Sequence, residues 1–175
     1  GVGQSETAVH SMVDFFLLVQ IAGAGDELQG IKRGIMEMAD SIIINKADGN
    51  NITRAELAKV QLQNALHLFP PHESGVEPKV MTCSAYEKTG IKEIWENILH
   101  YCSETQQSKY FDIRRSEQAQ YWMYETINEQ LRNRFYQSQK EQIREAEEKV
   151  QHNEESSFAA AFRLLDNYFK EDTKL

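Results

Sequence analysis

Residues 41–48 read Ser-Ile-Ile-Ile-Asn-Lys-Ala-Asp. Consecutive isoleucines bounded by polar residues are typical of a short, buried β-strand, because β-branched side chains pack well on a pleated surface. The residues that follow the isoleucines have the form Asn-Lys-x-Asp. Open α/β sheets bind their ligands at the carboxyl ends of the strands. This segment therefore predicts a buried strand with a ligand-binding loop directly after it.

Strand and helix patterns alternate on both sides of this segment. Val13–Val19 and Lys79–Cys83 are short and apolar, and they predict two more strands. Helices are predicted over residues 28–39, from a capping box at residues 53–56, and over residues 91–102. Strands that alternate with helices imply parallel pairing and right-handed crossovers. We therefore expect an α/β fold, with further strands upstream in the complete domain.

The Asn-Lys-x-Asp side chains suit a guanine base. Guanine presents two adjacent donors, the ring N1–H and the exocyclic amine, and the carboxylate of Asp48 can accept both hydrogen bonds. Adenine lacks this pair of donors, so the same carboxylate would reject it. Lys46 can lay its aliphatic stem across the base, while Asn45 can either tie neighbouring loops together or face the acceptor edge of the base. The alternative is an ordinary turn after a strand, where Asn, Asp and Gly are common.

A second short motif follows the next predicted strand. Residues 82–85 read Thr-Cys-Ser-Ala, and a Ser-Ala pair at this place resembles that of G domains. There the alanine amide donates to guanine O6, and small side chains let the backbone approach the base. Alone, this motif would indicate only a polar turn, but its position after the first motif supports the same site. The candidate guanine-binding residues are Asn45, Lys46, Asp48, Ser84, Ala85 and Tyr86.

Toward the carboxyl terminus the character of the sequence changes, and no strand pattern remains. Residues 113–150 predict a long polar helix, and Ser156 or Ser157 can cap a last, amphipathic one. We expect an α/β part over residues 1–107 and an α-helical tail over residues 108–175. Such a tail can pack on itself, on the sheet or on a second subunit.

Composition and charge argue against several other classes. The formal net charge is −8, which disfavours nucleic-acid binding, and no apolar run is long enough to predict a membrane span. Cys83 and Cys102 lack metal-type spacing and indicate reduced thiols in a cytoplasmic protein. The scattered histidines predict no metal site. Trp95 is predicted to lie in the core, whereas Arg114 and Arg115 are predicted to be solvated.

In longer segments the chain resembles the MeaB/ArgK family. The resemblance rests on residues 1–6, 22–34 and 44–49, and it continues more weakly through the tail. The members are P-loop GTPases that serve as chaperones of methylmalonyl-CoA mutase, and they also carry the label of lysine/arginine/ornithine (LAO/AO) transport system kinases. The resemblance implies binding of GTP or GDP with Mg²⁺, GTP hydrolysis and control of cobalamin loading on the mutase. It also implies a homodimer held partly by C-terminal helices.

The resemblance assigns roles outside the guanine loops as well. Gly1 is similar to the glycine of the Asp/Glu-x-x-Gly element that senses the γ-phosphate. The candidates of this second switch are Gly1, Gln4 and Glu6. Residues 23–34 are similar to a third switch that contacts the mutase, although a glycine-rich loop capping a helix would also explain the glycines. The charged members of the third switch are Asp26, Glu27 and Lys32.

One motif of the family does not occur. Residues 1–175 contain no Gly-x-x-x-x-Gly-Lys-Ser/Thr loop, so we expect a truncated chain that retains guanine recognition, lacks phosphate binding and does not hydrolyse GTP by itself. Small signalling GTPases place a glutamine directly after the second-switch glycine. Val2 stands there, which predicts slow hydrolysis in the parent protein and acceleration by a partner. A non-enzymatic dimerisation module and an amino-acid transport kinase are the alternative functions.

Overall fold

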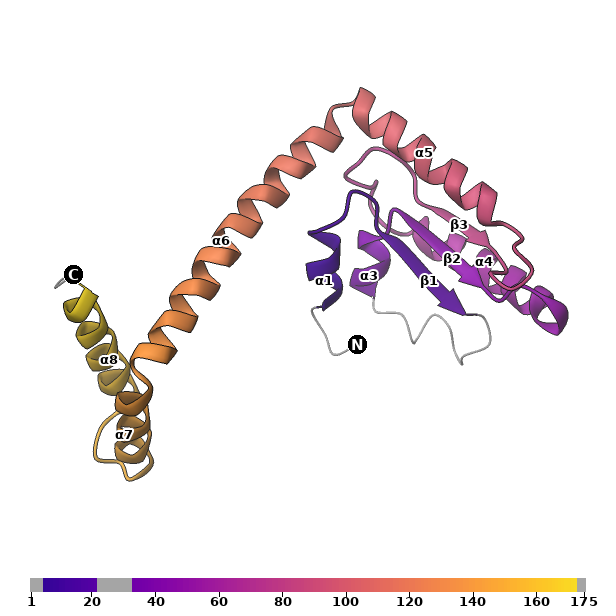
Figure 1. Cartoon of the computed structure of the whole chain (residues 1–175). Coiled ribbons are helices and arrows are strands. Elements are labelled where there is room, and N and C mark those ends of the chain that lie inside the picture. The colour runs from indigo at the N-terminus through magenta and orange to yellow at the C-terminus, as the bar shows by residue number, and fades with distance from the viewer. Residues whose placement is uncertain (1–4, 22–32, 173–175) are drawn as a thin grey trace. The chain divides into compact units, whose positions relative to one another are not determined.

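The computed structural model describes residues 5–21 and 33–172, and it divides into two compact units, residues 1–119 and 120–175 (Figure 1). The switch candidates Gly1, Gln4, Asp26, Glu27 and Lys32 lie outside the described residues. Glu6 lies in the short helix α1 (Ser5–His10).

A parallel three-stranded sheet forms the centre of the first unit, as the sequence predicted. Its strands are β1 (Leu17–Ile21), β2 (Ser41–Asn45) and β3 (Lys79–Thr82), in the order β1-β2-β3. The prediction that the first strand begins at Val13 is wrong. The backbone N–H of Phe16 donates to the Asp40 carboxylate (2.7 Å) and its carbonyl accepts from the Asp40 N–H (3.0 Å). These bonds lead the chain into the sheet, and the ladder with β2 starts at Leu17.

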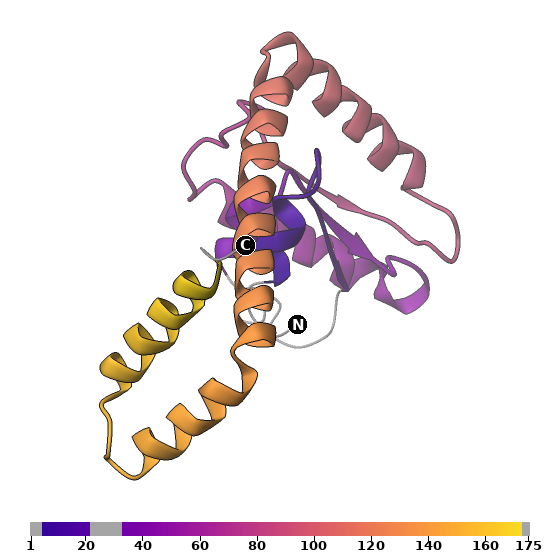
Figure 2. The same cartoon turned by 60° about the vertical axis from the view of Figure 1, so that its left-hand side comes forward.

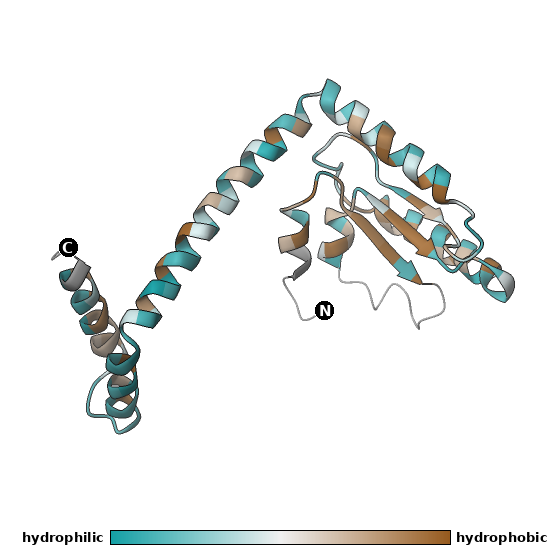
Figure 3. Cartoon of the chain, in the orientation of Figure 1, coloured by the Kyte–Doolittle hydropathy of each residue, from teal (hydrophilic) through white to brown (hydrophobic). Residues whose placement is uncertain are grey.

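Helices cover both faces of the sheet, which explains why β2 is apolar on both sides. On one face lie α3 (Arg33–Met38) and α4 (Ile52–Leu66), and on the other lies α5 (Ile91–Gln107) (Figure 2). Successive β2 side chains point to opposite faces of the sheet. Ile42 and Ile44 pack in a cluster with α3 and α4 residues, and Ile43 packs with Cys83 and Ile94. Figure 3 shows this apolar band along the strands.

Three local predictions about helices α4 and α5 are wrong. α4 begins at Ile52, after a 3-10 turn η1 (Gly49–Asn51), so Thr53 lies inside the helix rather than capping it. Glu56 accepts a hydrogen bond from the Thr82 hydroxyl (2.9 Å) instead of closing a capping box. Trp95 is 58% exposed. α5 turns Ile94 rather than Trp95 toward the sheet, because neighbouring positions on a helix face different directions.

Over its described residues, 108–172, the tail contains three helices: α6 (Tyr110–Ser138), α7 (Lys140–Gln151) and α8 (Ser157–Asp172). The long predicted helix is therefore broken at Gln139. α7 and α8 pack through Ala146, Ala160 and Leu164. Ser156 caps α8 as predicted, since its hydroxyl accepts from the Ala159 N–H (3.2 Å). Among the described helices, none is long and apolar enough to cross a lipid bilayer.

A buried polar cluster in the first unit contradicts the prediction that Arg114 is solvated. Arg114 is 7% exposed, and its Nη1 lies 3.6 Å from the fully buried Asp40 carboxylate and 3.3 Å from the Tyr101 hydroxyl. Its Nη2 donates to the His10 carbonyl (3.4 Å). Burial, assisted by the charge of Arg114, lowers the pKa of the His10 side chain. A buried arginine beside a carboxylate is a tertiary pairing that helical periodicity does not reveal.

The lowered pKa of His10 predicts a pH dependence of stability. When the pH falls below about 6.5, the unfolded chain binds a proton at His10 before the folded chain does. This contribution to stability is therefore complete above that pH and is lost as the pH falls through the folded-state pKa. We expect the urea midpoint to fall between pH 7 and pH 5, and to fall less in His10→Asn. Equal pH profiles for the two proteins would contradict this assignment.

Candidate functional site

The loops that follow β2 and β3 are locked together at the carboxyl edge of the sheet. The Cys83 N–H donates to the Ile44 carbonyl (2.9 Å), and the Ala47 N–H donates to the Cys83 carbonyl (2.9 Å). These bonds extend the β2–β3 pairing beyond the strands themselves. Two motifs that are far apart in sequence, residues 45–48 and 83–85, thus form one structure.

Asn45 ties the two loops together through its side-chain oxygen. Its Oδ1 accepts from the Lys46 N–H (2.8 Å) and from the Ala85 N–H (3.1 Å), and the Cys83 thiol donates to it at 3.6 Å. Of the two roles considered for Asn45, this geometry favours the tie. The Ala85 amide, which the sequence assigned to a base oxygen, donates to Asn45 in this structure. Burial raises the pKa of the Cys83 thiol, and both cysteines are free.

The carboxylate of Asp48 is held by a serine. The hydroxyl of Ser84, which is fully buried, donates to Asp48 Oδ2 and accepts from the Glu87 N–H (3.0 Å). Asp48 itself is half-buried. A neutral hydroxyl can orient a carboxylate without cancelling its charge. The pair therefore presents a fixed anionic acceptor at the surface of the loops.

Both loops contain left-handed backbone at lysine residues. Lys46 has φ of 63° and Lys88 has φ of 59°. The carbonyl of Lys46 is fixed by the side-chain amide of Asn51 (2.9 Å). Such conformations are unfavourable for residues with a Cβ and cluster at ligand-binding sites. The same backbone occurs at Lys109 and Asn153, in the turns between helices, so the left-handed lysines describe how the loops turn, and no sequence pattern indicated them.

A glycine closes the second loop. Ser84 and Thr89 exchange backbone hydrogen bonds of 3.0 and 3.1 Å, so residues 84–89 form a closed turn. Gly90 follows with φ of 74°, and a Cβ at this position would lie 2.5 Å from the Thr82 carbonyl oxygen. Ala85 and Tyr86 sit on the outside of the turn, and Tyr86 is 90% exposed. Sequence reasoning missed Gly90, although a glycine directly before a helix could have indicated it.

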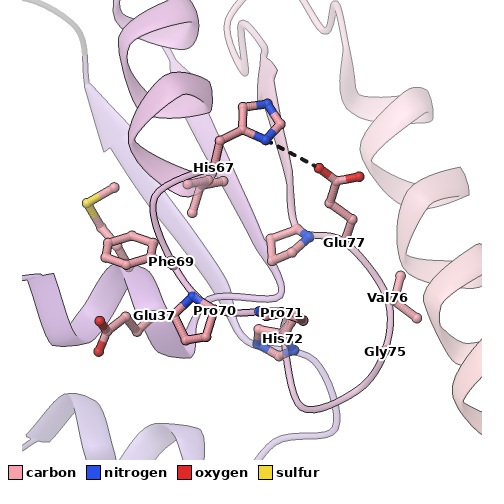
Figure 4. A pocket seen from close by; sticks show the side chains of 12 residues that line it. Glu37, His67, Phe69, Pro70, Pro71, His72, Gly75, Val76 and Glu77 are labelled. Carbon is pink, nitrogen blue, oxygen red and sulfur yellow. Dashed lines mark ion pairs between the residues drawn. The ribbon is translucent and has the colours of Figure 1, made fainter.

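A defined pocket lies at the other end of α4 and contains none of the candidate guanine-binding residues. Its volume is about 340 Å³, and its walls come from α3, the end of α4 and the proline-containing loop before β3 (Figure 4). His67 Nδ1 and Glu77 Oε1 lie 3.8 Å apart on this pocket. Within residues 5–21 and 33–172, no group of three His, Cys, Asp or Glu side chains could hold a metal ion. The candidate guanine-binding residues lie in the carboxyl-edge loops, away from this pocket.

Comparison with known proteins settles the family. The family described as methylmalonyl Co-A mutase-associated GTPase MeaB matches residues 1–140. This chain belongs to that family.

Individual members of the MeaB family and a solved structure agree with this assignment. GTPase ArgK of Escherichia coli (strain K12) is 44% identical over 136 residues, which are 78% of this chain and 41% of that protein. The methylmalonic aciduria type A homolog, mitochondrial, of Mus musculus is 40% identical over 167 residues, which are 94% of this chain and 40% of that protein. The crystal structure of an LAO/AO transport system kinase matches with a TM-score of 0.73 and 36% identity, over 96% of this chain and 54% of that one. The chain thus spans about half the length of these MeaB-family relatives or less, and the predicted α/β fold is confirmed.

Proposed function

We propose that this chain is the base-recognising part of a GTP-binding protein that hydrolyses GTP and acts as a chaperone of methylmalonyl-CoA mutase. The observation that carries the proposal is the Ser84–Asp48 pair at the edge of two interlocked loops. A charged carboxylate in that position can accept both donors of guanine. The family description supports the reaction and the partner, because it names a GTPase and the mutase.

The residues around Asp48 would take separate parts in holding the base. Lys46 is exposed, and its aliphatic stem can cover one face of the ring. The Ala85 N–H would release Asn45 Oδ1 and donate its hydrogen bond to guanine O6 instead. Tyr86 would border the base from the outside of the turn. Asn45 would keep its contact with the Cys83 thiol, and the backbone bonds of Cys83 with Ile44 and Ala47 would keep the two loops in register.

The chain's own residues fit the base better than they fit the phosphates and Mg²⁺. The sequence holds no phosphate-binding Gly-x-x-x-x-Gly-Lys-Ser/Thr loop, and the described residues hold no cluster of metal ligands. Mg²⁺ bound with GTP would neutralise charge that develops on the phosphates during hydrolysis. We propose that Gly1, Gln4 and Glu6 belong to the switch that senses the γ-phosphate, and that Asp26, Glu27 and Lys32 meet the mutase.

The tail, residues 108–175, is proposed as a homodimerisation arm of the α/β part, residues 1–107. α8 buries Ala160, Leu164 and Tyr168 on one stripe and exposes a second apolar stripe. The exposed stripe consists of Phe158, Phe162, Leu165 and Phe169. Exposed aromatic surface of this kind marks a protein interaction site. The same surface favours the alternative of a non-enzymatic interaction module, so nucleotide binding must decide between the two.

Nucleotide binding by the full-length gene product tests the proposal. We expect GDP and GTP to bind at least 100-fold more tightly than ATP, since adenine leaves the Asp48 carboxylate without donors. Fluorescent-nucleotide titration with unlabelled competitors measures this ratio. Equal affinity for GTP and ATP would overturn guanine recognition. Failure to bind any nucleotide, with a dimer seen by light scattering, would favour the interaction module.

Hydrolysis gives a second test. Because Val2 stands where signalling GTPases carry a water-orienting glutamine, we expect slow turnover alone and faster turnover when a cobalamin-dependent methylmalonyl-CoA mutase is added. Phosphate release with and without the mutase measures both rates. Fast turnover without a partner would contradict the slow intrinsic rate. No effect of the mutase would contradict the chaperone role while leaving guanine recognition intact.

A further inference from the structure

The start of helix α6 is joined to the rest of the first unit by a group of polar contacts, which lie beside the half-buried aromatic residues Tyr110 and Phe111. Arg114 is the only buried residue among its 29. Ile113, an apolar residue of the first turn, is 55% exposed. Arg114, Arg115 and Gln118 make the hydrogen bonds that join the start of this helix to the sheet-containing part. We call this set of contacts the α6 seam.

The acceptors of the α6 seam come mainly from one short segment, residues 10–16, which connects α1 to β1. Arg115 forms two hydrogen bonds with the Asp14 carboxylate, of 2.7 and 2.6 Å. Gln118 Nε2 donates to the Val13 carbonyl (3.0 Å) and lies 3.4 Å from the His10 carbonyl oxygen. Arg114 Nη2 contacts the same His10 carbonyl. The predicted solvation of Arg115 is therefore only partly right: its guanidinium is exposed but paired.

Asp40 adds a second anchor to the same segment. Its carboxylate accepts from the Phe16 N–H and faces Arg114, so it links residues 10–16, the start of β2 and α6. His72 Nε2 lies 3.7 Å from the other carboxylate oxygen, which has no hydrogen-bond partner. Arg114 and His72 thus lie farther from the buried carboxylate than ordinary hydrogen-bond partners do. Such a cluster is less rigid than a fully satisfied one.

We propose that the α6 seam is a conformational coupling that makes the start of α6 follow movements of residues 10–16. The contacts of Arg115 and Gln118 can be exchanged for water at little cost, so the start of this helix can shift while Arg114 stays paired with Asp40. Residues 10–16 continue directly from α1, and Glu6 of α1 is a candidate of the γ-phosphate-sensing switch. This inference rests on the proposed function. It means that the position of the start of α6 depends on which nucleotide is bound, because the seam links that helix to α1 through residues 10–16.

The coupling is reciprocal by thermodynamic necessity. Whatever holds α6, such as a second copy of the tail, would bias residues 10–16 and the nucleotide that the switch prefers. The buried Arg114–Asp40 pair stays in place in both states. The exposed contact of Arg115 with Asp14 and the half-buried contacts of Gln118 are the ones that break and form again.

Hydrogen exchange in the full-length gene product tests the seam without relying on nucleotide. In Arg115→Ala/Gln118→Ala, which keeps the buried Arg114–Asp40 pair, we expect exchange in residues 110–119 and 10–16 to rise about tenfold. Hydrogen exchange in peptides from β2 and α4 should stay the same. Arg132→Ala removes an exposed arginine further along the same helix, and as the matched control it should leave residues 110–119 unaffected. Unchanged exchange in the double variant would overturn the seam.

The nucleotide arm of the same experiment tests the coupling. Exchange in residues 110–119 should differ between the GDP complex and the complex with a non-hydrolysable GTP analogue. The difference should vanish in the double variant while its affinity for both nucleotides is kept. Equal exchange in the two complexes would overturn the coupling. A protein that binds neither nucleotide would instead overturn the proposed function. In that case, the comparison of the double variant with the unsubstituted protein in the absence of nucleotide would still test the seam.

Discussion

Replacing Asp48 by asparagine is expected to weaken GDP binding by about 100-fold, because the carboxamide offers one acceptor where guanine needs two. Its amino group would also face a donor of the base. Xanthine carries a carbonyl in place of the exocyclic amine, so it presents a donor beside an acceptor and matches the carboxamide. We therefore expect Asp48→Asn to bind xanthosine diphosphate more tightly than GDP. Competition titrations with the two diphosphates on the full-length gene product measure the reversal.

The control for this exchange is Glu87→Gln, which removes one carboxylate from the exposed part of the neighbouring loop. It should leave both affinities within about a factor of two, as expected for a screened surface charge. The Ser84 hydroxyl can donate to the carboxamide oxygen, so the loops should stay folded in Asp48→Asn. A variant that prefers guanine as strongly as the unsubstituted protein would show that Asp48 does not read the base.

The sheet and its site loops could be predicted from the sequence because both depend on local patterns. In β2, Ile43 faces one helical layer while Ile42 and Ile44 face the other, and only a strand buried on both sides needs such a run. Residues 45–48 come directly after the isoleucines, so predicting the strand also predicted that these residues lie at the carboxyl edge of the sheet. The parallel pairing then brought residues 45–48 and 83–85 together.

Features that depend on distant partners could not be predicted in the same way. The apolar side chains of residues 13–16 indicated a strand. Instead, the side chain of Asp40, which is 24 residues away in sequence, accepts the hydrogen bond of the Phe16 backbone N–H. Arg114 looked like an exposed residue of a polar helix, and only the fold places Tyr101 and Asp40 beside it. The same holds for the Cys83 thiol and the Ala85 N–H, which meet on Asn45 Oδ1. Each is a pairing between segments that periodicity treats as independent.

Gly90→Ala is expected to destabilise the chain by about 3 kcal/mol, through two effects that add. A left-handed backbone costs an alanine roughly 1 kcal/mol relative to glycine. The new Cβ would also lie 2.5 Å from the Thr82 carbonyl oxygen and 3.1 Å from Cys83 Cα, and forcing atoms into a packed site costs about 1–3 kcal/mol. Because the clashing atoms are backbone, the end of β3 must shift. Urea unfolding of the chain measures the loss.

Gly75→Ala separates the two effects. Gly75 has nearly the same backbone, with φ of 73°, yet a Cβ there would meet nothing within 4 Å. Its substitution should therefore cost only the backbone part, roughly 1 kcal/mol. Cys83 and Ser84 follow directly after the displaced end of β3, so Gly90→Ala should also weaken guanine-nucleotide binding in the full-length gene product, whereas Gly75→Ala should not. Equal stability losses in the two variants would mean that the second loop yields without strain, and that its close fit against β3 does not hold Ser84 beside Asp48.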